Sequence, residues 1–229
     1  MRAEQIAFIE AIADEPEDDA LRLIYADWLD ENGDEARAEF IRVQCELEQL
    51  DDTEPRFFDL RRKEASLLAA HYQRWIADLL PFVTAYADNP TRYSRGFLRS
   101  IVISPAELVQ YAEQIFMRTP CRAIELDHIG RSDFHRLAHW PQISKVRRLS
   151  FMSGSTEDLA SLLASAHLTR LESLSIQYNS ECAALIAAWP GASCLRELSL
   201  FDGSIGCEGL RALSESPHLS SLKSLIVAY

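Results

Sequence analysis

The chain has 229 residues, of which 48% are hydrophobic and 25% are charged, so it is long enough to bury one or two cores and is not disordered. It has no apolar run of about 18 residues, and the acidic residues Glu4, Glu10 and Asp14 stand where a secretory signal would be basic and then apolar. We therefore expect a cytoplasmic protein that has no membrane partner.

The acidic residues are concentrated at one end of the chain. Residues 1–50 carry 15 acidic and 4 basic side chains, a net charge of −11, whereas the remainder carries 20 and 19, a net charge of −1. An acidic surface repels phosphate backbones, so we expect no nucleic-acid partner. Two interpretations of this surface remain open: it keeps the protein soluble, or it docks a basic protein.

The five cysteines favour free thiols. Their number is odd, their surroundings are apolar, and no C-x-x-C spacing or paired histidine ligands accompany them. We predict buried thiols, with no disulfide, metal or cofactor, at Cys45, Cys121, Cys182, Cys194 and Cys207.

Apolar spacing predicts three helices in residues 1–50, an acidic helical domain. The first spans residues 3–13, the second follows Asp19 and ends at Asn32-Gly33, and the third runs from about Asp34 to Leu50. The stripe expected to be buried in the second helix is Leu21, Ile24, Tyr25, Trp28 and Leu29. The three helices should form one small bundle.

These helices carry a dense signature: Phe8-x-x-Ala11-Ile12, then Asp18-Asp19-x-x-Arg22-Leu23-x-Tyr25-Ala26-Asp27-Trp28-Leu29, then Gly33-Asp34-x-x-Arg37-Ala38-Glu39-Phe40-Ile41-Arg42. It resembles the bacterial repeat-companion domain, a short module known chiefly as the N-terminal companion of repeat arrays. The resemblance covers about residues 3–48. It implies an architecture and transfers no catalytic residues.

The polar residues of this signature raise the question of a cation site. Asp30-x-Asn32-x-Asp34 begins like a calcium loop, but Gly33 stands one position before the third ligand and Ile41 replaces the closing glutamate. A structural role fits better. We expect ion pairs to aspartates, or bonds to helix C-terminal carbonyls, from Arg22, Arg37 and Arg42.

Residues 51–96 are predicted to be a helical linker and the N-terminal cap of a repeat domain. A polar joint at 51–56 precedes a long helix from Phe57 to about Leu80, which Pro81 ends. Residues 82–96 are expected to form a loop. A cap is needed because the open end of a repeat array exposes apolar surface.

An apolar spacing of the form L-x-x-L-x-L recurs through residues 97–229. Its central pairs are Ile101/Ile103, Ile124/Leu126, Leu149/Phe151, Leu174/Ile176, Leu198/Leu200 and Leu225/Val227, at steps of 23, 25, 25, 24 and 27 residues. The pattern resembles leucine-rich repeats of the ribonuclease-inhibitor-like class. The resemblance implies an α/β fold: a curved solenoid of about six repeats, with a parallel β-sheet on the concave face and helices on the convex face.

The expected strands are 97–104, 122–128, 146–152, 171–177, 195–201 and 222–228, and the expected helices between them are 105–116, 132–139, 156–166, 180–188 and 207–214. Alternate strand residues face opposite sides of a sheet. The outward residues that we expect to bind a partner are Glu125, Asp127, Met152, Gln177, Tyr178, Phe201, Asp202 and Tyr229. Aromatic side chains among them favour a protein interface.

The sequence favours a non-catalytic, protein-binding scaffold. One alternative is a GTPase-activating module, which needs an exposed loop arginine such as Arg95 or Arg131. Another is a cysteine-dependent enzyme acting through Cys182, Cys194 or Cys207, although none stands in a catalytic motif.

The segment Leu222–Tyr229 is predicted to be the final strand of the sheet. An unpaired strand edge presents free backbone donors and acceptors. It could pair with a second copy of the chain, bind an extended peptide, or be covered by the terminal turn. A homodimer through this edge is one expectation.

Overall fold

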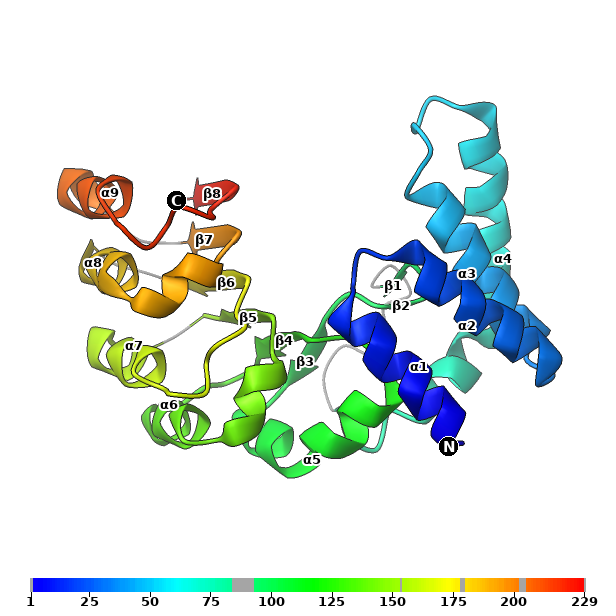
Figure 1. Ribbon diagram of the computed structural model, residues 1–229, viewed down its shortest axis with the longest axis horizontal. Helices are drawn as coiled ribbons and strands as arrows, with labels where there is room; N and C mark the ends of the chain where they lie inside the picture. Colours follow the sequence, from blue (N-terminus) through cyan, green and yellow to red (C-terminus); the bar gives the residue numbers. More distant parts are fainter. Residues whose placement is uncertain (1, 84–92, 153, 178–179, 202–204, 229) are drawn as a thin grey trace. The chain divides into compact units, whose positions relative to one another are not determined.

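The computed structural model describes residues 2–83, 93–152, 154–177, 180–201 and 205–228. Within them the protein is a mixed α/β structure with nine α-helices and a six-stranded parallel sheet (Figure 1), which confirms the predicted α/β class. The chain divides into two compact units. We call Met1–Ile101 with Glu113–Cys121 the helical unit, and Val102–Ala112 with Arg122–Tyr229 the sheet unit. The three-part division predicted from the sequence stays a prediction.

The helical unit contains the predicted helices. Its elements are α1 (Ala3–Asp14), α2 (Asp19–Glu31), α3 (Glu35–Leu47), α4 (Pro55–Ala77), β1 (Tyr93–Ser94) and β2 (Phe97–Leu98). Pro55 occupies the first turn of α4, where its missing N–H costs nothing. The helix ends at Ala77, three residues before the predicted end at Leu80.

The turn between α2 and α3 is set by local chemistry. Gly33 has φ +83°, and its N–H donates to the carbonyl of Asp30 while the N–H of Asp34 donates to that of Leu29. This pair of bonds is a Schellman motif, which satisfies carbonyls that the helix end leaves free. The predicted helix end at Asn32-Gly33 is confirmed.

The buried face of α2 differs from the predicted stripe. Tyr25 and Leu29 are buried as expected, but Ile24 is 53% exposed. Arg22 takes an inward position and donates to the carbonyl of Asp18 at 3.0 Å. An arginine can be buried when its guanidinium has a backbone partner and its aliphatic stem packs on apolar side chains. Because Arg22 takes a place on the buried face of the helix, Leu23 and Ile24 lie on the opposite, exposed face.

Residues 93–98 form a β-hairpin, so the predictions of a loop through residue 96 and of one strand over 97–104 are wrong. Tyr93 pairs with Leu98 and Ser94 with Phe97. The two turn residues, Arg95 and Gly96, have φ of 49° and 88°. Positive φ at both positions is the signature of a type I′ turn, which matches the twist of two antiparallel strands.

The sheet unit alternates strands and helices. Its strands are β4 (Ala123–Leu126), β5 (Arg148–Phe151), β6 (Ser173–Gln177), β7 (Glu197–Phe201) and β8 (Ser224–Ala228), preceded by β3 (Ile101–Ile103), which spans the boundary between the units. The helices are α6 (Arg131–Ala138), α7 (Thr156–Leu163), α8 (Ser180–Ala188) and α9 (Gly206–Ser214), and α5 (Pro105–Arg118) also spans the boundary. The strands lie in chain order, β3 to β8.

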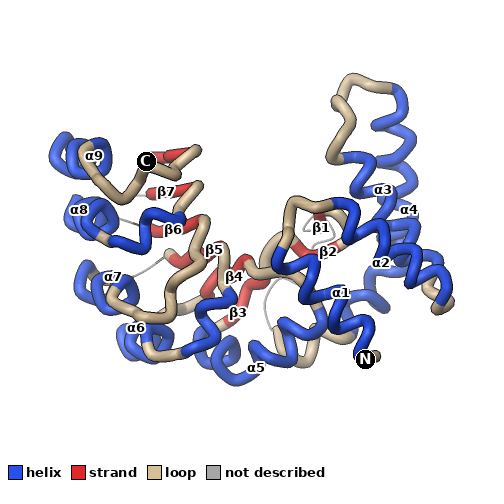
Figure 2. Tube along the Cα trace, viewed as in Figure 1, coloured by secondary structure: helices blue, strands red, loops and turns tan. Residues whose placement is uncertain are grey.

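The register joins the predicted apolar positions across the sheet. Leu149 pairs with Leu174, Leu174 with Leu198, and Leu198 with Leu225. Figure 2 shows α6–α9 along one side of this sheet. The first three of these leucines are buried beneath that layer of helices.

The connections that follow the helices of the sheet unit are of two alternating kinds, which the sequence analysis did not separate. After α6 and α8 come short 3₁₀ helices, Pro141–Lys145 and Pro190–Cys194, each preceded by a buried tryptophan. After α7 and α9 come Ser165 and Ser216, whose hydroxyls donate at 2.5 Å to the carbonyls of Ala138 and Ala187. Ser165, which follows α7, thus bonds to the end of α6, and Ser216, which follows α9, bonds to the end of α8.

Helix packing follows the same alternation. Helix α6 packs closely on α7 and α8 on α9, whereas α7 and α8 pack less closely. Helices α6 and α7, and likewise α8 and α9, therefore belong to two similar pairs of strand–helix segments. The serine bond closes each pair.

Strand β8 differs from the inner strands. Leu225, at the position where Leu198 is fully buried, is 43% exposed. The homodimer through this strand stays a prediction. None of the helices in the described residues is long and apolar enough to cross a membrane.

Candidate functional site

The face of the sheet opposite the helices, which we call the outward face, is built by alternation along the strands. Leu149, Leu174 and Leu198 point toward the helices and are buried, whereas their neighbours Ser150 and Ser175 are half-buried. The register places one outward row in line: Glu125, Ser150, Ser175, Ser199 and Ile226. The strand period thus brings residues some 25 positions apart side by side.

A second outward row carries most of the predicted binding residues. Gln177 pairs with Phe201, and Phe201 with Ala228. Phe151 pairs with Ile176, so the residues that follow them, Met152 and Gln177, come next to each other in this row. Met152 is 59% exposed. Asp127 likewise follows the end of β4. Tyr178, Asp202 and Tyr229 lie outside the described residues.

A row of charged residues at the start of the strands was missed by the sequence analysis. Backbone bonds align Arg122, Arg147, Glu172, Arg196 and Lys223 across the sheet. Glu172 forms ion pairs with Arg147 and, at 3.8 Å, with Arg196, while Arg148 pairs with Glu197 at 2.9 Å. A charge two positions before each central apolar residue was the sequence signal. The row ties neighbouring strands together at the end of the sheet where the strands begin.

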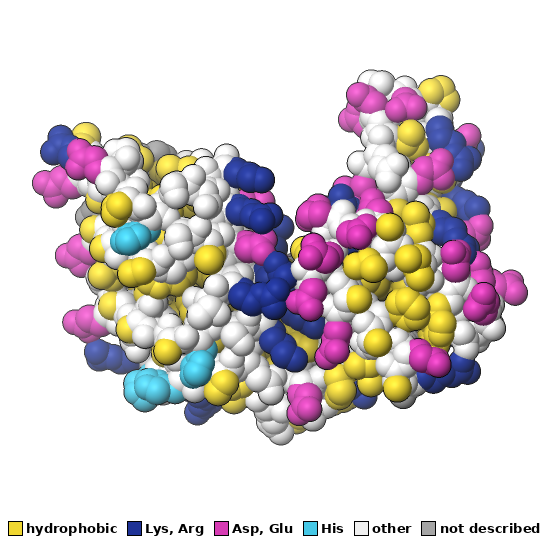
Figure 3. All heavy atoms as spheres, in the orientation of Figure 1, with side chains coloured by type: hydrophobic (Ala, Val, Ile, Leu, Met, Phe, Trp, Pro, Cys, Tyr) yellow, Lys and Arg dark blue, Asp and Glu magenta, His cyan; other side chains and the backbone are white. Residues whose placement is uncertain are grey.

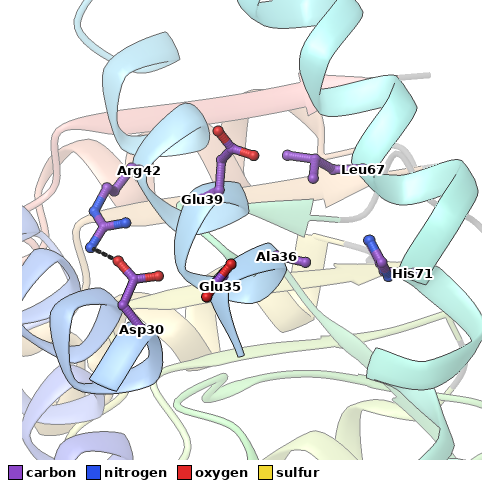
Figure 4. A pocket seen from close by; sticks show the side chains of 7 residues that line it. All are labelled: Asp30, Glu35, Ala36, Glu39, Arg42, Leu67 and His71. Carbon is purple, nitrogen blue, oxygen red and sulfur yellow. Dashed lines mark ion pairs between the residues drawn. The ribbon is translucent and has the colours of Figure 1, made fainter. Parts of the chain in front are cut away.

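The helical unit has a groove of about 590 Å³ between α3 and α4 (Figure 4). It is lined by Asp30, Glu35, Ala36, Glu39, Arg42, Leu67 and His71. Acidic side chains outnumber basic ones on its walls. No group of three or more His, Cys, Asp or Glu side chains that could hold a metal ion occurs in the described residues.

The predicted arginine roles hold in part. Arg42 donates to Asp27 at 2.7 Å and pairs with Asp30 at 2.6 Å, as expected. These hydrogen bonds, with the one to Asp27 the largest cause, raise the pKa of Arg42. Arg22 bonds to a carbonyl at the start of its own helix, and Arg37 bonds to a turn carbonyl, so the expectation of helix C-terminal carbonyls is wrong for both.

Arg37 lies among aromatic rings. Its guanidinium carbon is 4.8 Å from the ring centroid of Trp75 and 5.5 to 5.6 Å from those of Phe40, Tyr93 and Phe97. Its Nη2 donates to the carbonyl of Gly96 at 2.5 Å. Burial lowers the pKa of Arg37, but a guanidinium stays charged, and the ring faces attract it. This cluster joins α3, α4 and the hairpin.

The arginines considered for GTPase activation are held in ion pairs. Arg95 pairs with Glu17 at 2.9 Å and with Asp19 at 3.5 Å. Arg131 pairs with Glu157 at 2.9 Å and with Asp158 at 3.7 Å. Both would have to break these pairs to reach into a nucleotide site.

The prediction that all five thiols are buried is wrong for two of them. Cys45, Cys121 and Cys182 are buried, but Cys194 and Cys207 are exposed. Cys194 ends a 3₁₀ helix at the surface, where its Sγ lies 3.6 Å from the carbonyl of Thr169, and Cys207 sits in the first turn of α9. Burial, followed by the charge of Asp19, raises the pKa of Cys45 to about 12.

Thiol titration of the native protein should therefore find two fast-reacting groups, Cys194 and Cys207, because only an accessible thiolate attacks a disulfide reagent. The other three thiols should react only after unfolding. A variant with Cys194→Ser and Cys207→Ser should lose the fast phase while keeping the slow one. A fast phase that survives in this variant would contradict the described burial.

Comparison of the chain with models of protein families, with curated proteins and with solved structures gave no match.

Proposed function

We propose that this protein is a non-catalytic scaffold that binds a protein partner on the outward face of its sheet. In this proposal residues 97–229 form a leucine-rich repeat solenoid of about six repeats, with the outward face concave. The helical residues 1–50 act as its repeat-companion domain, and residues 51–96 as a linker and cap. The in-register apolar positions support the repeat assignment.

One observation carries the binding site. On the outward face, strand ends bring a 59% exposed methionine, Met152, next to the Gln177–Phe201 pair. Exposed large apolar side chains on a surface that also carries serine and charged residues are typical of interface centres. Glu125 in β4, and Asp127 directly after β4, belong to the same outward face. The proposed site includes Tyr178, Asp202 and Tyr229 on sequence grounds alone.

The test begins with affinity capture from the native cell by the tagged protein, followed by purification of the captured partner. Replacing Met152 and Phe201 with alanine should then weaken binding by about thirtyfold, as expected when two central interface side chains are removed. Titration calorimetry measures the change. The matched control is Leu210→Ala, which removes an exposed apolar side chain from α9.

Circular dichroism must show that each variant is folded. Unchanged affinity in the Met152→Ala, Phe201→Ala double variant would refute the outward-face site. Equal loss in the Leu210→Ala control would place the partner on the helices instead.

A further inference from the structure

The exposed face of α2 is apolar over one and a half turns. Ala20, Leu23, Ile24, Asp27 and Glu31 follow the helical spacing of one face, and all five are exposed. Leu23 is 38% exposed and Ile24 53%. The outer face of a helix is normally polar, so two adjacent large aliphatic side chains there call for a partner.

A rigid layer of aromatic rings supports this face. The rings of Tyr25 and Trp28 stack with centroids 5.9 Å apart, and Phe8 packs on both, at 5.4 and 5.9 Å. Trp28 is half-buried. These rings pack α2 against α1 and hold the helix in place. Leu23 and Ile24 therefore lie on a preformed surface, which lowers the conformational entropy lost on binding.

Acidic side chains border the apolar face. Asp27, one turn after Leu23 and Ile24, has a side chain that is 70% exposed. It shares Arg42 with Asp30, and both Asp30 and Arg42 line the groove between α3 and α4 together with Glu35 and Glu39. The acidic border therefore continues from α2 into the groove, where Arg42 pairs with Asp30 and Lys63 pairs with Glu39, so a cationic partner would compete with these two basic side chains. Figure 3 shows hydrophobic side chains over α1 and α2 with Asp and Glu side chains around them.

We propose that Leu23, Ile24 and the acidic groove lined by Asp30, Glu35 and Glu39 form a docking site for a cationic amphipathic helix of a partner protein. Its aliphatic side would cover Leu23 and Ile24. Its lysines or arginines would face Asp27 and enter the groove. This site is separate from the outward face of the sheet and does not depend on the function proposed for that face.

Charge selects this occupant among the alternatives. Residues 1–50 carry a net charge of −11, which repels an acidic peptide, a nucleic acid or an anionic lipid surface. A second copy of the chain would bring the same charge to the same face. A cationic segment alone gains from both the apolar face and its border.

The test uses a fluorescent synthetic helix of leucine and lysine, with a leucine–glutamate helix of the same length as its matched probe. Fluorescence anisotropy at low salt should show saturable binding of the lysine helix only. Leu23→Ser with Ile24→Ser, and separately Glu35→Gln with Glu39→Gln, should each weaken binding about tenfold or more. Added salt should weaken binding further, because exposed charges are screened.

Two control variants distinguish binding at this site from non-specific binding. Phe58→Ser removes an exposed apolar side chain from α4, and Glu208→Gln with Glu215→Gln removes two exposed charges from the sheet unit. Both should leave binding unchanged. Equal binding of the two probes, no saturation, or equal losses in the controls would overturn the proposal. So would sedimentation showing a dimer that only the Leu23→Ser, Ile24→Ser variant dissociates, because a second copy would then be the occupant.

Discussion

Replacing Arg37 with alanine is expected to lower the free energy of unfolding of the helical unit by about 3 to 5 kcal/mol. The change empties the space among the four rings around the guanidinium and removes the donor to the carbonyl of Gly96, which is a buried residue. An unsatisfied buried carbonyl costs about 1 to 3 kcal/mol, and the lost cation–π contacts add to it. Urea denaturation followed by circular dichroism measures the difference.

Arg42→Ala is the matched control, because Arg42 lies on the same helix and the side chains of its ion pairs with Asp27 and Asp30 are each more than a third exposed. Exposed pairs contribute about 1 kcal/mol or less. If Arg37→Ala costs no more than Arg42→Ala, the ring cluster does not hold α3, α4 and the hairpin together. Arg37→Met should lie between, since it fills part of the space without the hydrogen bond.

Gly96→Ala should destabilise the helical unit by about 3 kcal/mol, from two additive causes. At a φ of +88° a side chain strains the backbone, and the added Cβ would overlap the side chain of Ile41. The backbone N–H of Gly96 also donates to Oε1 of Gln44 at 2.6 Å, so the turn cannot move away without losing a buried bond. Thermal and urea unfolding measure the change.

The two causes can be separated with Ile41→Ala as a second change. In that background the contact with Cγ1 is removed and only the tight contacts at 3.1 Å with the Cα and Cβ of residue 41 remain, so most of the cost of Gly96→Ala should be the backbone strain, about 1 to 2 kcal/mol. Gly33→Ala is the control for strain alone, because Gly33 has φ +83° and no atom lies within 4 Å of its added Cβ. A cost for Gly96→Ala equal to that of Gly33→Ala would show that Ile41 yields freely.

The sequence predicted best the elements whose apolar spacing repeats. Helix α8 has the predicted bounds, Ser180–Ala188, and the central leucines of neighbouring strands pair as expected. Burial in a repeating structure depends on side-chain period and spacing, which are visible in the sequence. The outward rows follow from the same period.

The sequence predicted least where one residue makes a long-range contact. The hairpin depends on Gly96 against Ile41 and Gln44, residues 55 and 52 positions away. The buried face of α2 depends on Arg22, for which the sequence predicted an ion pair or a bond to a helix C-terminal carbonyl and not a bond to the carbonyl of Asp18. Neither a buried arginine nor a tertiary clash produces a periodic signal. For this reason the sequence could not predict that Leu23 and Ile24 are exposed, nor the docking site proposed on α2.

The hydrogen bonds of Ser165 and Ser216, one within each pair of strand–helix segments, limit how segments can be added to the chain. Ala138 and Ala187, the two acceptors, stand 49 positions apart, and the donors Ser165 and Ser216 stand 51 apart. Duplicating one segment of about 25 residues would place two like connections in succession, leaving a helix-end carbonyl without its serine or a serine without its carbonyl. Duplicating two segments preserves every such bond. An engineered chain that grows by two segments should therefore keep these bonds, whereas one that grows by a single segment should lose one and be less stable by about 1 kcal/mol.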